Sequence, residues 1–343
     1  MTHRGLVERI SPLWLGIGIS TSLLVILAVA ETVQGRWDGL LAGGDFNALA
    51  SVSGGILRDL RIAIVHCLII GYLPAALLHV LRSGRRTVLV LQDSLNCTRE
   101  ECEALATSVR LSTPGLIITA FVGLALAFVS PYLVPPVPPA PWSPSTWSAE
   151  VVWHRLLGPG TMVLGWWLGY AIVSVSVRLS RIATRISQID LLDLSPLAPF
   201  TKLGLTNALL PVGYLSIWSL MLLEEGFGQL MWMVSGATLV LASLSLMSPV
   251  RGVHRRILQS KEAELGWVND AIADCRNAFQ GRDIDPRTGE MADLIAYRNL
   301  VEGVPEWPFT TSTYTRLFLY ALLPVASWTI GVIAEEIVGR AFS

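Results

Sequence analysis

Seven long runs without a charged side chain constrain this chain more than any other feature of its sequence. They are Pro12–Ala30, Ile62–Leu81, Pro114–Tyr132, Leu156–Val177, Leu205–Leu223, Leu230–Met247 and Leu317–Ala334. A helix rises ~1.5 Å per residue and the hydrocarbon core of a bilayer is ~30 Å thick, so each run can cross a membrane. Because lipid offers no hydrogen-bond partner, the backbone groups must be satisfied within each segment. The sequence therefore predicts an all-α, polytopic membrane protein with seven transmembrane helices.

The basic residues gather on one side of the predicted membrane. Of 25 Lys and Arg residues, 20 lie before the first run or at 82–112, 178–204 and 251–316. Cytoplasmic loops carry the excess of Lys and Arg, which predicts that the N-terminus is inside and the C-terminus outside. With 23 Arg against two Lys, the composition favours a bacterial inner (plasma) membrane. The lipid bilayer is thus the first expected partner, and a net charge of −1 gives no reason to expect nucleic acid.

The segments between the runs predict three parts. Residues 1–248 form a six-helix transmembrane bundle with cytoplasmic extensions at 82–112 and 178–204, residues 249–312 a cytoplasmic helical hairpin, and residues 313–343 the seventh transmembrane helix with a short outer tail. In the hairpin, apolar residues recur at seven-residue spacing, which is typical of a helix that packs against a partner. These are Leu258, Leu265, Ile272 and Phe279, with Val268 at a complementary position and with His254 and Lys261 interrupting the seam. The partner is another cytoplasmic helix, a second copy or a cytosolic protein.

Prolines and glycines mark special positions in the runs. Pro74, Pro211 and Pro324 lie inside three of them, where each removes a helical hydrogen bond and predicts a kink that can serve gating. Gly165 and Gly169 form a G-x-x-x-G pattern, which favours close helix packing within the bundle or between subunits.

No motif in the sequence names a reaction. It has no H-E-x-x-H, G-x-S-x-G or phosphate-binding glycine loop, so we expect no enzyme, catalytic residue, metal site or cofactor. Three of the four cysteines (Cys97, Cys102 and Cys275) would face the reducing cytosol and Cys67 lies in the second run, so we expect no disulfide. His66 is an ionisable group at membrane depth, which is a candidate functional group or a neutral histidine bonded to a neighbouring helix.

Acidic residues cluster on the predicted outer face. Glu224 and Glu225 lie at the tip between the fifth and sixth runs, and Glu335 and Glu336 follow the seventh run. In a symmetric oligomer such residues would repeat as a ring that attracts cations at a pore mouth. The plainer interpretation is that helix ends are polar because they meet water.

The layout resembles that of the insect odorant and gustatory receptor family. The resemblance lies in seven spans with the N-terminus inside, a very short outer tail, and cytosolic helices before spans five and seven. In the gustatory branch the seventh helix opens with Thr-Tyr, five residues and Gln-Phe, whereas here Thr313-Tyr314 is followed five residues later by Tyr320-Ala321. The resemblance implies a tetrameric cation channel whose seventh helix lines the pore and whose cytosolic helices form a shared anchor.

Three functions fit the sequence. The first is a homo-oligomeric, cation-conducting channel with the last helix near the pore axis. The second is a non-conducting membrane sensor or assembly scaffold that docks a cytosolic partner through residues 250–305. The third is a secondary transporter, for which His66 near Pro74 is the best pointer, although seven spans do not divide into the equal repeats typical of transporters.

Overall fold

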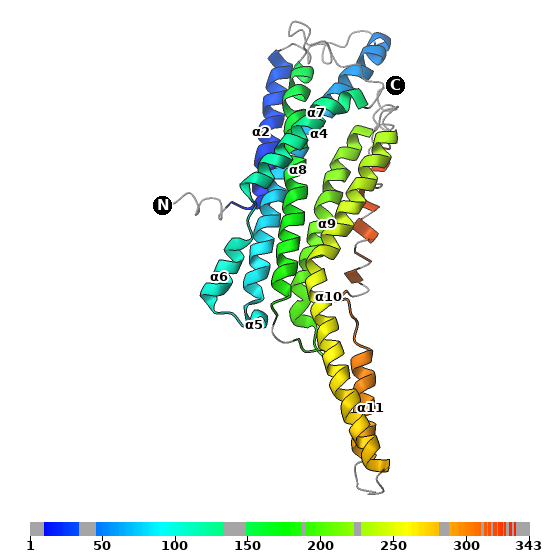
Figure 1. Cartoon of the computed structure of the whole chain (residues 1–343). Coiled ribbons are helices and arrows are strands. Elements are labelled where there is room, and N and C mark those ends of the chain that lie inside the picture. Colours follow the sequence, from blue (N-terminus) through cyan, green and yellow to red (C-terminus); the bar gives the residue numbers. More distant parts are fainter. Residues whose placement is uncertain are drawn as a thin grey trace.

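The structure is a computed structural model, which describes residues 10–33, 46–133, 149–186, 189–222, 228–280, 288–309 and part of 312–333. All regular structure in these residues is helical, and they contain no strand. The predicted all-α class is therefore confirmed. Long helices pack side by side into a bundle, and one helical hairpin projects from an end of it (Figure 1).

The long helices of the bundle are, in chain order, α2 (Pro12–Val33), α4 (Phe46–Val90), α7 (Thr113–Leu133), α8 (Ala149–Ala183), α9 (Ala198–Trp218) and α10 (Gly228–Gln280). The short helices α5 (Gln92–Leu95) and α6 (Arg99–Ser108) join α4 to α7. Single 3-10 turns, η2 (Ser195–Leu197) and η3 (Ser219–Leu222), flank α9. The part of α10 beyond Gly252 pairs with α11 (Thr288–Glu302) to make the projecting element, which we call the α10–α11 hairpin.

Five of the described helices are long and apolar enough to cross a membrane. They are α2, α4, α7, α8 and α10, each of which contains one of the apolar runs. The fifth run forms α9, which is not among the five. It carries nine buried residues and packs along both α10 and α4 at the centre of the bundle. The seventh run is helical at the positions that the structure describes. The described chain is thus all-α, and its long apolar helices indicate a protein embedded in a membrane.

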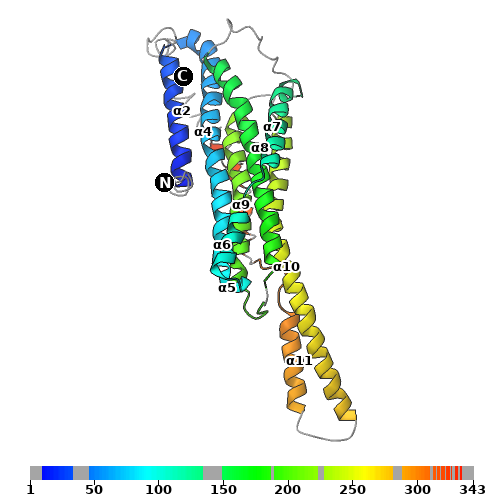
Figure 2. The same cartoon turned by 60° about the vertical axis from the view of Figure 1, so that its left-hand side comes forward.

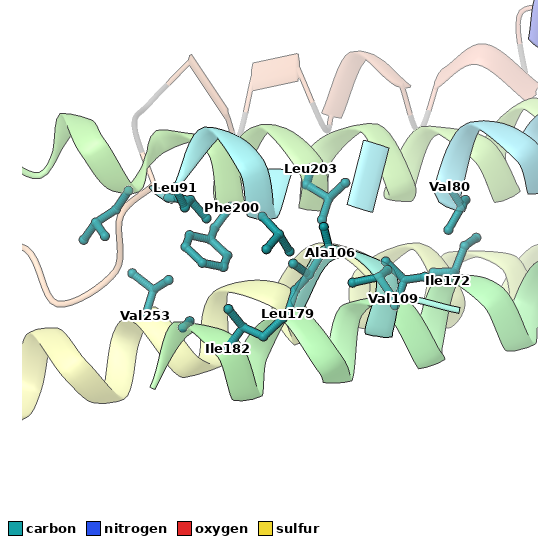
Figure 3. Close-up of a cluster of buried hydrophobic side chains, with 14 of the residues drawn as sticks. Val80, Leu91, Ala106, Val109, Ile172, Leu179, Ile182, Phe200, Leu203 and Val253 are labelled. Atoms are coloured by element: carbon teal, nitrogen blue, oxygen red, sulfur yellow. The ribbon is translucent and has the colours of Figure 1, made fainter. Parts of the chain in front are cut away.

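The largest apolar core is formed by side chains of α4, α8, α9 and α10 together with the α5–α6 connection, and Figure 3 shows part of it. Phe200 of α9, Leu179 of α8 and Val253 of α10 are all fully buried in it. The outer faces of α2 and α7, by contrast, expose large apolar side chains such as Trp14 and Phe121. A buried centre and an apolar exterior are what a helix bundle needs when its outer solvent is lipid.

Close helix contacts occur at glycines other than the predicted pair. A Cβ added to Gly204 of α9 would lie 2.7 Å from the carbonyl oxygen of Leu246 in α10, so these two backbones touch. An added Cβ at Gly165 meets nothing within 4 Å, and one at Gly169 meets only Leu241 at 3.9 Å. The G-x-x-x-G pair therefore makes no close helix contact within the described chain, and its use between subunits stays a prediction.

The connection from α4 to α6 contains a disulfide that the sequence analysis did not expect. The chain turns at Asn96, which has a left-handed φ of 48°, and then begins α6 with a capping box between Thr98 and Glu101. This turn brings the Cα atoms of Cys97 and Cys102 to 6.0 Å, and the two residues form a disulfide. The prediction that the chain has no disulfide is therefore wrong. It rested on the redox state of the predicted compartment, whereas the turn and cap set the pairing geometry.

Candidate functional site

Residues 303–309 follow α11 and lead toward the seventh apolar run, and we call them the return segment. Lys261 of α10 anchors its beginning. The Nζ of Lys261 donates to the carbonyl oxygen of Glu302 at 2.8 Å and to that of Val304 at 3.0 Å. These carbonyls lie at the C-terminal end of α11, where they have no intrahelical partner and where a cation is favoured. Lys261 therefore caps α11 from the neighbouring helix.

His254 of α10 holds the middle of the return segment. Its Nδ1–H donates to the carbonyl oxygen of Glu306 at 2.9 Å, since a carbonyl can only accept. The imidazole also stacks on the indole of Trp307, with ring centroids 4.0 Å apart and planes 9° apart. Trp307 in turn stacks with Phe309 at 5.8 Å. Three aromatic rings thus fix the direction in which the chain leaves the hairpin.

Helix α9 binds the end of the return segment. The hydroxyl of Thr201 donates to the carbonyl oxygen of Pro308 at 3.0 Å. Phe309, and Tyr320 in the seventh run, pack against a second apolar cluster from α9 and α10. That cluster contains Leu205, Ala208, Val212, Ala242 and Leu246. The described part of the seventh run accordingly lies along α9 and α10 (Figure 1).

These contacts join three elements at one place: the α10–α11 hairpin, the α9–α10 pair and the start of the seventh run. The return segment is thus bonded both to the hairpin and to α9, next to the start of the seventh run. From the sequence, His254 and Lys261 were predicted only to interrupt an apolar seam, and their contacts with the return segment were not predicted. The Trp307-Pro308-Phe309 sequence was the available signal.

The predicted seam of the hairpin is buried only in part. Val268 is fully buried and Leu265 packs partly buried against the main core, whereas Leu258 and Ile272 are half-buried. The side chain of Phe279 lies outside the described residues. The partner is α11 of the same chain, which contributes the fully buried Val301.

A polar contact accompanies this packing. The Tyr297 hydroxyl of α11 donates to the Glu264 carboxylate of α10 at 2.8 Å. The hydrogen bond to the carboxylate raises the pKa of Tyr297 because the neutral phenol is the form that can donate.

The hairpin also exposes large apolar side chains. Trp267 of α10 is 57% exposed and Leu300 of α11 is 54% exposed, and Ile295 is exposed as well. The intramolecular pairing of α10 with α11 therefore leaves part of the hairpin's apolar surface uncovered.

The four glutamates of the predicted pore mouth lie outside the described residues. Glu224 and Glu225 follow η3, and Glu335 and Glu336 follow the described part of the seventh run. Their role as a cation-attracting ring stays a prediction.

Seven polar side chains are buried in the described part of the apolar runs, and two of them, His66 and Asn207, are larger than a hydroxyl-bearing Ser or Thr. His66 is 4% exposed, and its Nδ1–H donates to the carbonyl oxygen of Ile62 in its own helix at 2.8 Å. Asn207 of α9 is fully buried, and neither of its amide atoms has a hydrogen-bond partner in the part of the chain that the structure describes. A buried amide without a hydrogen-bond partner lowers the free energy of unfolding, so its presence in the core requires a physical explanation. The sequence analysis missed Asn207, although it is the one Asn in the seven apolar runs.

The three predicted kink prolines all lie in helical segments. Pro74 is inside α4 and the buried Pro211 is inside α9, while Pro324 is buried at a helical position of the seventh run. Their part in gating stays a prediction.

Within the described residues, no group of three or more His, Cys, Asp or Glu side chains is arranged to hold a metal ion. Comparison of the chain with models of known protein families, with curated proteins and with solved structures finds no match in any of the three. The resemblance in layout to insect odorant and gustatory receptors therefore remains a prediction.

Proposed function

We propose that this protein is a homo-oligomeric ion channel, selective for cations, in the inner membrane of a bacterium. The chain crosses the membrane seven times with its N-terminus inside and its C-terminus outside. The seventh run lies near the shared axis, and the α10–α11 hairpin anchors the subunits in the cytosol. The acidic pairs Glu224-Glu225 and Glu335-Glu336 mark the outer mouth. Tetramers are the expected assembly by analogy of layout.

The position of the seventh run supports this proposal. One face of the run packs on α9 and α10 through Tyr320, whereas Phe318 is 66% exposed and Ile330 is 67% exposed. The run therefore lies at the edge of the bundle and offers an uncovered face. Apolar side chains fill the bundle core itself. Because the described core residues are packed and mostly apolar, we place the path for ions between copies, where the seventh run has an exposed face.

Ion flux into proteoliposomes tests the proposal. We expect the purified protein to pass cations, and the double variant Glu335→Gln with Glu336→Gln to reduce cation flux. Glu290→Gln is the matched control, because Glu290 is an exposed glutamate of α11 far along the chain from the mouth. Absence of flux, or flux that the double variant and the control leave equally unchanged, contradicts the proposal. A protein that is monomeric in nanodiscs would also contradict the proposal, because the ion path is placed between copies.

A second function is favoured by the uncovered apolar surface of the hairpin. Trp267, Ile295 and Leu300 are exposed on a pair of helices outside the apolar runs, where water and not lipid is the expected solvent. Exposed apolar residues of this size mark protein contacts. A non-conducting sensor or scaffold would dock a cytosolic partner here, through residues 250–305. A stoichiometric partner that is recovered by the full chain and lost on Trp267→Ser, together with absence of flux, would support this function over the channel.

A further inference from the structure

A groove of about 390 Å³ opens between α4 and α7. Both helices pack along α8, and Figure 2 shows them on its two sides. Leu77, Leu81 and Arg85 of α4 form one wall, and Leu116 of α7 with residues 109–111 forms the other. Trp167 of α8 also lines the groove. Its volume lies within the range of about 300–1,000 Å³ that is typical of ligand sites.

The second wall of the groove is fixed to α8 by polar contacts. The indole Nε1–H of Trp167 donates to the carbonyl oxygen of Leu116 at 3.0 Å. The hydroxyls of Ser112 and Tyr170 are 2.7 Å apart and hydrogen-bonded, and Arg178 donates to the carbonyl oxygen of Ser108. Gly84 lets this wall approach α4, because an added Cβ there would lie 3.1 Å from the side chain of Val109. The groove is therefore preformed, which reduces the entropy that a ligand must lose on binding.

The surface of the groove is almost entirely apolar, and the two arginines among its lining residues lie just beyond the ends of the apolar runs. Leu77 and Leu81 belong to the second run, and Leu116 begins the third. Arg85 comes four residues after the second run, and Arg110 comes four residues before the third. No acidic side chain lines the groove. Arg85 and Arg110 thus lie where the predicted membrane surface meets the apolar groove.

We propose that this groove binds a phospholipid with an anionic headgroup. An acyl chain lies against Leu77, Leu81, Leu116 and Trp167, and the guanidinium groups of Arg85 and Arg110 bind the headgroup. Guanidinium suits this role because it stays charged and its fork of N–H donors matches phosphate oxygens. Basic pockets between helices at the membrane surface recognise lipid headgroups by this chemistry. The site requires only that the bundle lies in a bilayer, so it does not depend on whether the protein conducts.

Native mass spectrometry of the full chain in detergent, with phosphatidylglycerol or phosphatidylcholine added, tests the site. We expect selective retention of phosphatidylglycerol. The double variant Arg85→Gln with Arg110→Gln should weaken this binding about thirtyfold, and each single variant about fivefold. Arg85→Lys with Arg110→Lys keeps the charge and should restore most of the binding, which separates loss of the site from loss of the fold.

The matched control is Arg181→Gln, which removes an exposed arginine near the same end of α8 that does not line the groove. It should leave phosphatidylglycerol binding within twofold of the wild type, roughly the size of an ordinary surface effect. A second variant, Leu116→Trp, fills the apolar part of the groove and should weaken the binding without changing any charge. Equal retention of the two lipids overturns the proposal, as does an effect of Arg181→Gln equal to that of the double variant.

Discussion

The imidazole of His254 in α10 lies parallel to the indole of Trp307, which is 53 residues further along the chain, with ring centroids 4.0 Å apart. This stack joins the longest helix of the protein to the segment that leads into the seventh run. It holds the segment that leads into that run against the side of α10.

Trp307→Ala should loosen the return segment. The variant loses the stacks on His254 and Phe309, each worth about 0.5–1.5 kcal/mol beyond the buried area. We expect faster amide hydrogen exchange in residues 303–309, with α4 and α8 unchanged. His254→Phe is the matched variant, because it keeps an aromatic ring and removes only the bond to Glu306. Unchanged exchange in Trp307→Ala would contradict the role of the stack.

Lys261→Met should fray the last turn of α11. Methionine keeps most of the apolar stem and removes the two hydrogen bonds to the carbonyls of Glu302 and Val304. A charged hydrogen bond of this kind contributes about 1.5–3 kcal/mol. Hydrogen exchange at residues 299–304 measures the effect. The second lysine of the chain, the exposed Lys202, provides the control in Lys202→Met, which should leave α11 unaffected.

The start of α6 should weaken at acidic pH. Glu101 accepts from the backbone N–H and the hydroxyl of Thr98, and these bonds lower the pKa of the Glu101 carboxyl. A group whose folded-state pKa is lowered stabilises the fold above its unfolded pKa. That stabilisation is lost as the pH falls through the folded pKa. The protection of the amides in residues 99–104, which is their exchange rate corrected for the intrinsic pH dependence, should therefore fall on acidification. Glu101→Gln should remove this dependence, and its persistence in the variant would rule out Glu101 as the cause.

Removal of the disulfide should destabilise the α5–α6 connection. Closing a loop of this size restricts the unfolded chain by about 2 kcal/mol at most. The double variant Cys97→Ser with Cys102→Ser should lower the stability of α6 by up to that amount. Maleimide labelling of intact cells with and without reductant shows whether the bond exists there. Labelling of both cysteines without reductant would place them in a reducing compartment.

Asn207→Leu should raise the thermal stability of the protein. Leucine has the same branched shape and the same number of side-chain heavy atoms as asparagine. It leaves no unsatisfied amide in the core, so we expect a gain of about 1–3 kcal/mol. Ala208→Leu, one residue away, is the overpacking control and should destabilise. A loss of stability in Asn207→Leu would show that the amide has a partner in the membrane, such as a water molecule.

The helices and the hairpin could be predicted from the sequence, because they follow from the periodicity of apolar residues and the distribution of charge. The contacts between residues far apart in the chain could not. The absence of charge from the runs determined the helices, and the heptad spacing near Leu265 and Val268 revealed the hairpin. His254 and Lys261 looked like defects because their partners lie 41 to 52 residues away in a segment without periodicity. Gly204 had no motif to distinguish it from Gly165, although Gly204 contacts a neighbouring backbone and Gly165 does not. The Cys97–Cys102 pairing depended on a left-handed turn at Asn96 that composition does not reveal.

Helix α10 continues without a break for 53 residues, which gives a rod about 80 Å long. Its backbone is in close contact with α8 at Gly252, where an added Cβ would strike the carbonyl oxygen of Ser180. If α10 is held at this contact, its two ends move in opposite directions when the helix tilts. A tilt of about 10° at Gly252 would swing Gln280, which is about 42 Å away along the helix, by about 7 Å. A small rearrangement among the apolar helices would therefore become a large movement at the tip of the hairpin.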